Sequence, residues 1–343
     1  MKHIFSNSII WLLLFSLWLA GCSPATTNTL EQTLQGNTMG TTYSVKFYSQ
    51  QPVDNQALQQ LINQELELIN DLMSTYRPES ELMRFNQLPD TASFTLSEQT
   101  AKVVAEAIRI GHQSGGVLDI TVGPLVELWG FGASGRITER PATDTLAAIQ
   151  HYVGLEKISL AGNQLSKTDP RLAIDLSTIA KGYGVDQIAT ILENHDINDY
   201  LVDIGGEMRL KGSKPDRAWR IAIEKPVAGQ RSMQRILEPG NMAVATSGDY
   251  RNYFEQDGIR YSHLIDPRTG APIQHRTVSS TVLHASSMTA DGYATALHIM
   301  DANEALQFAN QHDIAALLIV KTDDGYTEMV SNAFQPIIDN EKR

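Results

Sequence analysis

The sequence has little cysteine, no excess of basic residues and almost no long apolar runs. One cysteine is present in 343 residues, so stability must come from an ordinary core, which 42% hydrophobic residues can supply. The formal net charge of −12 argues against nucleic acid as a partner, because that binding depends on neutralising phosphates with Lys and Arg. If so acidic a protein handles a phosphorylated ligand, a metal cation must offset the repulsion.

The one long apolar run lies at the N-terminus and ends at the single cysteine. Lys2 supplies a positive start, and the apolar residues 9–20 are too few to span a bilayer of about 30 Å as a helix. Residues 1–21 are therefore predicted to be a signal peptide. The box Leu19-Ala20-Gly21-Cys22 resembles that of bacterial lipoproteins, whose cysteine sulfur is acylated after cleavage in front of it. We expect an exported protein anchored by lipid at Cys22; the alternative is an ordinary secretory signal with an incidental cysteine.

The rest of the chain divides into a short tether and one long body. Residues 22–36 are polar and rich in Thr, Asn and Gln, which predicts a tether. Residues 37–343 contain no Pro/Ser-rich linker, no internal repeat and no second membrane-spanning stretch. We expect this part to be a single catalytic domain, with two lobes as a variant of the same interpretation.

Strands and helices alternate in this body without the regular rhythm of a doubly wound parallel sheet. The pattern favours a mixed α/β (α+β) fold with largely antiparallel sheets and packed helices. Ser97 should begin a helix that Gly115-Gly116 ends, and Asp257-Gly258 should be the turn of a hairpin. The predicted strands are 41–48, 171–174, 200–204, 250–256 and 259–264, and the predicted helices are 56–72, 97–114 and 177–194.

One glycine-rich stretch, at residues 130–135, matches the dinucleotide-binding pattern by its letters alone. That motif needs a strand before it and a helix after it, so that main-chain amides can face a pyrophosphate. Here residues 124–129 predict a short helix, and residues 136–141 do not open a good one. We therefore expect a flexible loop and not a Rossmann fold.

The segment 175–184 places two glycines in the opening turns of a predicted helix. Each costs about 1 kcal/mol in helix propensity, so Gly182 and Gly184 need a reason. Close approach of a ligand is one, because a helix N-terminus offers free N–H groups to a phosphate. Close packing against another part of the chain is the other, and the sequence leaves both open.

The segment 287–295 places Asp291 and Thr295 four residues apart, and hence on one face of a helix. A carboxylate and a hydroxyl are hard oxygen ligands that suit Mg²⁺. The alternative is an acidic residue that stabilises the start of the helix beside a solvent-facing threonine.

Two further residues stand where chemistry is feasible. His263 ends a predicted strand before a tight Asp-Pro turn, and an imidazole there could take a proton from an attacking hydroxyl. Asp119 lies between apolar neighbours, so a buried carboxylate there needs a partner such as a ligand hydroxyl or amide. A purely structural role is the alternative for each.

Taken together, these segments resemble the ApbE-type FAD:protein FMN transferases. The resemblance implies FAD as the donor and Mg²⁺ as the metal, with FMN joined through its phosphate to a threonine hydroxyl of another protein while AMP leaves. It is carried by 39–43 (MGTTY), 74–76 (STY), 119–124 (DITVGP), 175–177 (DLS), 203–207 (DIGGE), 246–248 (TSG), 262–267 (SHLIDP) and 291–296 (DGYATA).

The resemblance also implies roles for individual residues. Asp291 and Thr295 would bind Mg²⁺ through their side chains and Ala180 through its carbonyl oxygen, while His263 falls where a base has been proposed. The residues that fall where the family holds FAD are Met39, Tyr76, Val117, Leu118, Asp119, Ser177, Tyr183 and Ile265.

Two alternatives share the same motifs. Water in place of the threonine would make the protein an FAD pyrophosphatase that gives FMN and AMP, and a non-catalytic periplasmic flavin-binding lipoprotein would use the site for binding alone. The resemblance points to acceptors among periplasm-facing subunits of the Na⁺-translocating NADH:quinone reductase and related electron-transport proteins. Ser23 after the cysteine is typical of outer-membrane sorting, but such acceptors lie in the inner membrane, so we expect a lipid anchor on its periplasmic side.

Overall fold

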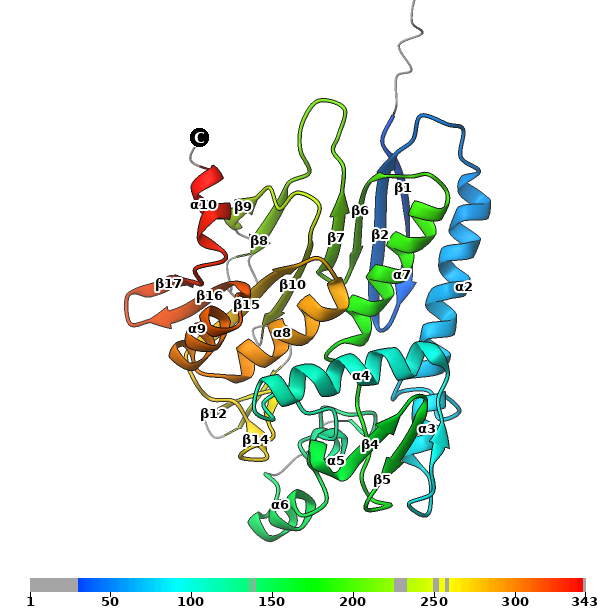
Figure 1. Cartoon of the computed structure of the whole chain (residues 1–343). Coiled ribbons are helices and arrows are strands. Elements are labelled where there is room, and N and C mark those ends of the chain that lie inside the picture. The colour runs from blue at the N-terminus through cyan, green and yellow to red at the C-terminus, as the bar shows by residue number, and fades with distance from the viewer. Residues whose placement is uncertain are drawn as a thin grey trace, which may run out of the picture. The chain divides into compact units, whose positions relative to one another are not determined.

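An antiparallel sheet of eight strands forms the centre of the chain in a computed structural model of the protein (Figure 1). The structure describes residues 30–135, 137, 140–224, 233–248, 253–256 and 259–341. All neighbouring strands of this sheet are antiparallel, which confirms the predicted mixed α/β class. In sheet order the strands are β1 (Gln32–Thr38), β2 (Thr41–Tyr48), β6 (Asp199–Ile204), β7 (Glu207–Lys211), β10 (Ala243–Gly248), β15 (Thr277–His284), β16 (Ala315–Thr322) and β17 (Gly325–Val330).

Helices cover one face of the sheet. α2, α7 and α8 lie along it, and α4 runs across the ends of α7 and α8 (Figure 1). The helices are α2 (Asn55–Met73), α3 (Glu81–Asn86), α4 (Glu98–Gln113), α5 (Gly123–Leu128), α6 (Thr143–Gln150), α7 (Ala180–Asn194), α8 (Ser287–Ile299), α9 (Ala302–Gln311) and α10 (Gln335–Glu341), with a 3₁₀ turn η1 at Leu155–Lys157.

The alternation of side chains along the strands produces this layering. In β2, which lies on the predicted strand 41–48, Tyr43, Val45 and Phe47 alternate with more exposed residues and are buried on one face. In the middle of the sheet, one set of alternating residues packs under α8 and the other under the opposite layer, β8 (Ile221–Glu224), β9 (Met233–Leu237) and α10. The first set is Ala245, Val282, Ala316 and Leu318, and the second is Val244, Leu283, Leu317 and Ile319.

The ends of α4 follow the sequence signals closely. The Ser97 hydroxyl accepts a hydrogen bond from the N–H of Thr100 at 3.2 Å, which caps the first turn. Gly115 and Gly116 adopt φ values of +65° and +85°, which terminate the helix at little steric cost. The predicted helix over 56–72 corresponds to α2.

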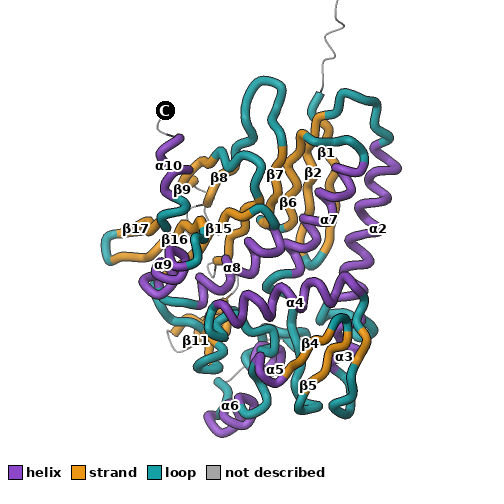
Figure 2. The backbone as a smooth tube through the Cα atoms, viewed as in Figure 1, coloured by secondary structure: helices purple, strands orange, loops and turns teal. Residues whose placement is uncertain are grey.

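Short elements and loops fill the segment between α4 and α7 (Figure 2). The glycine stretch 130–135 follows the short helix α5 and is a loop, so the prediction against a dinucleotide-binding motif is confirmed. The remaining short strands are β3 (Phe94–Thr95), β4 (Ile158–Ala161), β5 (Gln164–Lys167), β11 (Tyr253–Gln256), β12 (Ile259–Ser262), β13 (Ile265–Asp266) and β14 (Ala271–Pro272). β11 and β12 pair as the predicted hairpin, whose turn at 257–258 lies outside the described residues.

The prediction of a strand over 171–174 is wrong, because side chains occupy the main-chain groups that a neighbouring strand would need. The Asn86 side chain bonds to both the N–H and the carbonyl of Ile174, at 2.8 and 2.9 Å. The buried ammonium of Lys167 binds the carbonyls of Pro170 and Leu172 at 2.9 and 3.0 Å. The only sheet-like contact of these four residues is a single parallel bridge from Ala173.

The predicted start of α7 is also wrong. The helix begins at Ala180, and Ser177 lies in a turn before it, where its N–H donates to the Asp175 carboxylate at 2.8 Å. The Leu176 carbonyl accepts from the N–H groups of both Ile179 and Ala180, which closes this turn before the helix starts. Ser177 is therefore not the cap.

The chain divides into two units, Met1–Leu30 and Glu31–Arg343. The second unit is one compact body, and it includes residues 32–36 in β1, five residues that the sequence had placed in the tether. No helix in the described ranges combines the length and apolar character needed to cross a membrane. The predicted signal peptide and the predicted lipid attachment site at Cys22 lie outside the described residues.

Candidate active site

The first turns of α7 and α8 meet in a contact between main-chain atoms. A Cβ atom at Gly182 would overlap the carbonyl of Ser287 and lie 2.8 Å from the Cβ of Asp291. Of the two explanations that the sequence left open for Gly182, the structure shows close approach to another part of the chain. The glycine brings segments about one hundred residues apart into direct contact.

Asp291 lies at the centre of this contact. Its side chain is buried, and Oδ2 accepts a hydrogen bond from the N–H of Gly182 at 3.0 Å. The carboxylate thus satisfies one of the free N–H groups at the start of α7, where no side chain of the N-cap residue does so. Burial raises the pKa of Asp291 to about 7, against the opposing charge of Lys181 and with the help of Glu207.

Lys181, whose side chain is partly exposed, forms an ion pair with the buried Glu207 beside this carboxylate. Burial alone would lower the pKa of Lys181, but the charges of Glu207 and Asp291 hold it above its ordinary value. Burial raises the pKa of Glu207 although Lys181 opposes the shift. Two buried carboxylates and one partly exposed ammonium therefore share this site, and a bound cation would relieve the excess of negative charge.

The structure brings the three predicted metal ligands to this junction. Ala180 is the first residue of α7, two positions before Gly182, and Thr295 is one turn beyond Asp291 on α8, where it is also buried. Within the described ranges, three buried oxygen atoms close to these residues in the chain or in space have no hydrogen-bond partner: Thr178 Oγ1, Ser287 Oγ and Glu207 Oε2.

These residues fit a hard cation such as Mg²⁺. Carboxylate, hydroxyl and carbonyl oxygens are the ligands that Mg²⁺ prefers, and it usually completes its shell with water and substrate phosphate. No cluster of three or more His, Cys, Asp or Glu side chains suited to a metal occurs among the described residues. The ion would therefore be held by a mixed set of oxygens.

Two of the predicted FAD residues lie against the same pair of helices. Leu118 is buried, and its side chain lies 3.6 Å from the position of a Cβ at Gly292, the residue next to Asp291. Met39, at the turn between β1 and β2 with φ +47°, lies 3.1 Å from the position of a Cβ at Gly184. Residues from two distant segments thus converge on α7 and α8.

The loops that carry Asp119 and Ser177 run side by side. The N–H of Asp175 donates to the Ile120 carbonyl at 2.7 Å, and Ser177 is exposed two residues later. Asp119 is buried and accepts from the N–H and the hydroxyl of Thr121, at 2.7 and 2.6 Å. Burial raises the pKa of Asp119 despite these bonds. The sequence predicted that this carboxylate needs a partner, and the structure provides one in Thr121 of the same loop.

Tyr76 is the most exposed of the large residues predicted to hold FAD, with 68% of its surface accessible. Partial burial of its hydroxyl and the nearby charges of Asp175 and Glu127 raise its pKa. Glu127 in turn accepts from the N–H groups of Ala133 and Ser134, at 2.7 and 3.2 Å, and so holds the glycine loop in place. An exposed aromatic ring of this kind could stack against a planar ligand group.

His263 lies between β12 and β13, and Ile265 is the first residue of β13. Ile265 is buried with Trp129 and Val122, and the latter is three residues beyond Asp119 in the chain. The ring of His263 lies 6.4 Å from that of Phe131 in the glycine loop, in an edge-to-face arrangement. The predicted base therefore lies beside the glycine loop. We call residues 119–122, 130–135 and 263–265, together with Tyr76, the loop cluster.

Val117 and Tyr183 are inside the hydrophobic core. Tyr183 is only 2% exposed, and burial raises its pKa to about 12. The ring faces the ammonium of Lys102 at 5.8 Å. Their predicted contact with FAD stays a prediction.

Three charged residues at this site escaped the sequence analysis: Lys181, Asp186 and Glu207. Asp186 lies four residues after Gly182, hence on the same face of α7, and this spacing was the one available signal. Lys181 and Glu207 come from a helix and a strand whose pairing no local pattern indicates.

Comparisons with known proteins identify the family of this chain. The chain belongs to the ApbE family, whose model matches residues 39–318. It is 54% identical over 327 residues to the FAD:protein FMN transferase of Vibrio cholerae, covering 94% of this chain and 96% of the relative. The FAD:protein FMN transferase of Haemophilus influenzae is 43% identical over the full length of both chains.

Solved structures give the same result. The flavin transferase ApbE from Vibrio cholerae superimposes with a TM-score of 0.85 at 51% identity, covering 90% of this chain and 99% of that one. The apo form of the flavinyl transferase ApbE from Pseudomonas stutzeri gives a TM-score of 0.84 at 36% identity, covering 90% and 97%.

Proposed function

We propose that this protein transfers FMN from FAD to a threonine hydroxyl of an acceptor protein, with Mg²⁺ as its metal and AMP as the second product. Relatives at 54% and 43% identity are named FAD:protein FMN transferases, which supports an enzyme that moves FMN from FAD to protein. The structural observation that supports the proposal most is Asp291: a buried carboxylate with a raised pKa, one turn from a buried hydroxyl and against the first turn of α7.

The reaction is a displacement at phosphorus. The threonine oxygen forms a bond to the phosphorus on the FMN side of the FAD pyrophosphate, and the bond from that phosphorus to the bridging oxygen breaks. AMP leaves with the bridging oxygen, and FMN remains on the threonine as a phosphoester. When bound, Mg²⁺ would supply charge neutralisation to the pyrophosphate.

The chain's own residues divide the remaining work. Asp291, Thr295 and the Ala180 carbonyl would hold the ion, and His263 would accept the proton of the threonine hydroxyl. The loops that carry Tyr76, Asp119 and Ser177, together with Met39, Val117, Leu118, Tyr183 and Ile265, would hold FAD.

We further propose that the mature protein is anchored by lipid at Cys22 on the periplasmic side of the inner membrane. The Leu19-Ala20-Gly21-Cys22 box supports the anchor. Periplasm-facing subunits of the Na⁺-translocating NADH:quinone reductase, or of related electron-transport proteins, are the proposed acceptors.

The test is the intact mass of a threonine-bearing acceptor domain after incubation with residues 23–343, FAD and Mg²⁺. The proposal expects a mass gain equal to FMN less water, which disappears with EDTA or with Asp291→Ala. Release of AMP and free FMN without a mass gain would identify an FAD pyrophosphatase instead. Intact FAD and unmodified acceptor would leave a flavin-binding lipoprotein.

A further inference from the structure

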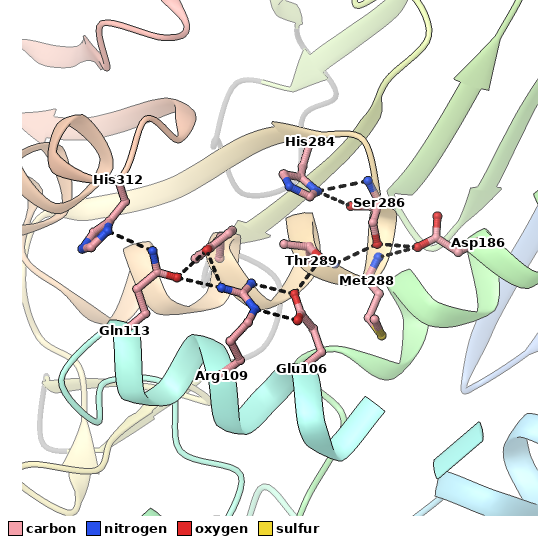
Figure 3. Close-up of polar contacts among 10 residues, drawn as sticks. Glu106, Arg109, Gln113, Asp186, His284, Ser286, Met288, Thr289 and His312 are labelled. Atoms are coloured by element: carbon pink, nitrogen blue, oxygen red, sulfur yellow. Dashed lines mark hydrogen bonds and ion pairs between the residues drawn. The ribbon is translucent and has the colours of Figure 1, made fainter. Parts of the chain in front are cut away.

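Asp186 of α7 is bonded to the start of α8 through both of its carboxylate oxygens, and Figure 3 shows the bonds from Ser286 and Met288. Oδ1 accepts from the N–H of Ser287 at 3.0 Å, and Oδ2 accepts from the Ser286 hydroxyl at 2.7 Å and from the N–H of Met288 at 3.1 Å. The guanidinium of Arg209 on β7 donates to Oδ1 at 2.8 Å and fixes the carboxylate from the other side. Asp186 therefore caps a helix to which it does not belong.

The same face of α7 makes a second contact with α8 one turn earlier. There the direction is reversed, because the N–H of Gly182 donates to Asp291 of α8. Each helix thus supplies a carboxylate that satisfies N–H groups at the start of the other. Two such contacts, four residues apart on both helices, fix how far α8 can slide or rotate against α7.

We propose that Asp186 is a positioning residue for the metal site: by holding the start of α8 against α7, it sets the distance between the Asp291 carboxylate and the Ala180 carbonyl. Ala180 belongs to α7 and Asp291 to α8, so any shift between the helices changes the separation of two of the proposed ligands. The inference rests on the proposed function, because it needs the metal site at this junction.

A second set of contacts restrains α8 from the side of α4. The Thr289 hydroxyl donates to Glu106 Oε1 at 2.7 Å, and Arg109 binds Glu106 as well as Tyr293 (Figure 3). These contacts hold α8 against α4 and do not involve α7. We expect these contacts to keep α8 in place when the Asp186 charge is lost, so that the effect on the metal can be measured in a folded protein.

The test compares Asp186→Asn with Glu193→Gln in the chain from residue 23, which retains the whole unit Glu31–Arg343. The unit Glu31–Arg343 is compact by itself, and the solved Vibrio cholerae structure matches 90% of this chain over 99% of its own length. Glu193 is a matched control: it lies on α7 and also pairs with Arg209, at 3.6 Å, but bonds to Tyr200 and Lys211 and not to α8. The readouts are the Kd for Mg²⁺ by calorimetry and the Mg²⁺ dependence of FMN transfer.

Asp186→Asn should raise the Kd for Mg²⁺ about tenfold, the lower end of the effect of residues that orient metal ligands. The Mg²⁺ concentration for half-maximal transfer should rise by the same factor, with a smaller change in kcat at saturating Mg²⁺, and Glu193→Gln should change neither. An unchanged Kd in folded Asp186→Asn, or an equal rise in Glu193→Gln, would overturn the inference.

Ser286→Ala, which removes one of the three contacts that the start of α8 makes to Asp186, serves if Asp186→Asn does not fold. It should raise the Kd by about two- to threefold, and an unchanged value would count against the inference. Wild-type protein that binds no Mg²⁺ would overturn the metal assignment in the proposed function, and this inference with it. Wild-type binding with no effect of the variants would overturn the inference alone.

Discussion

The two ends of the contact between α7 and α8 use the same chemical group in different ways. At one end Asp186 accepts two main-chain N–H groups, a hydroxyl and a guanidinium. At the other end Asp291 accepts one N–H from the described part of the chain, and burial raises its pKa to about 7. A carboxylate can accept about four hydrogen bonds, so Asp186 is saturated whereas Asp291 has capacity to spare.

The difference shows which buried carboxylate is built into the fold and which is available to a ligand. A saturated carboxylate stabilises the parts that surround it, and a further ligand would have to displace them. An unsaturated one in a buried site is costly unless a proton or a cation joins it. Spare acceptor capacity, rather than burial alone, therefore marks the candidate metal ligand.

The largest effect is expected from Asp291→Asn. FMN transfer should fall by more than about 100-fold, because a direct metal ligand is worth more than the residues that orient it. The metal-free variant should be at least as stable as the wild type at pH 8. A carboxyl whose pKa is raised in the folded state loses its stabilising contribution as the pH rises from about 4 to about 7, and the amide carries no such charge. Mass spectrometry of the acceptor and denaturant unfolding measure the two outcomes.

His263→Ala should sharpen the comparison, because it changes the loop cluster and leaves the junction intact. Turnover should fall by about 100-fold, the scale of a lost general base, while the KM for FAD and the Kd for Mg²⁺ change little. Steady-state kinetics at several FAD concentrations separate these quantities. A large rise in the KM for FAD with unchanged turnover would instead make His263 a binding residue.

The backbone contact can be broken directly by Gly182→Ala. The added methyl group would overlap the Ser287 carbonyl, so we expect a loss of about 1–3 kcal/mol of unfolding free energy together with weaker Mg²⁺ binding. Gly184→Ala on the same helix is the control. Its methyl group would meet the flexible ends of Met39 and Ile204, at 3.1 and 3.2 Å, which can move aside. Urea unfolding of both variants makes the comparison, and equal losses would contradict it.

The smallest effect concerns His298, which is buried on α8 beyond Asp291 and Thr295. Burial lowers the pKa of His298 to about 3, and its Nδ1 lies 2.8 Å from the Ser247 carbonyl, with His263 and His275 nearby. The unfolded chain binds a proton at this residue near pH 6.5 and the folded chain does not. Stability should therefore fall as the pH drops below about 6.5, by up to about 1.4 kcal/mol per pH unit from this group. Urea unfolding at pH 7.5 and 5.5 should show a smaller drop in His298→Asn than in the wild type.

Local patterns were enough to predict the elements whose stability is local. The cap at Ser97, the two glycines after α4 and the alternation in β2 each depend on residues within one turn or one strand. The segment 171–174 has the apolar residues of a strand, but Asn86 and Lys167 take its main-chain groups. These partners come from other parts of the chain, and no local pattern could reveal them.

The candidate site divides in the same way. Asp291 and Thr295 could be found because their spacing places both on one helix face. The resemblance to a family was needed for Ala180, whose contribution is a main-chain carbonyl that any residue type provides. Asp186, Lys181 and Glu207 depend on how α7 packs against α8 and β7, so their roles appear only once these elements are assembled.

The missing side chain at Gly182 has a consequence for how tolerant this site is to change elsewhere in the sequence. Most helix pairs are held apart by side chains, and their separation shifts whenever a core residue is exchanged. Here main-chain atoms are in contact, and those atoms are the same in every amino acid. The distance between α7 and α8 at this point is therefore set by the dimensions of the peptide unit itself. Substitutions in the surrounding core can change the volume of the core without changing this distance.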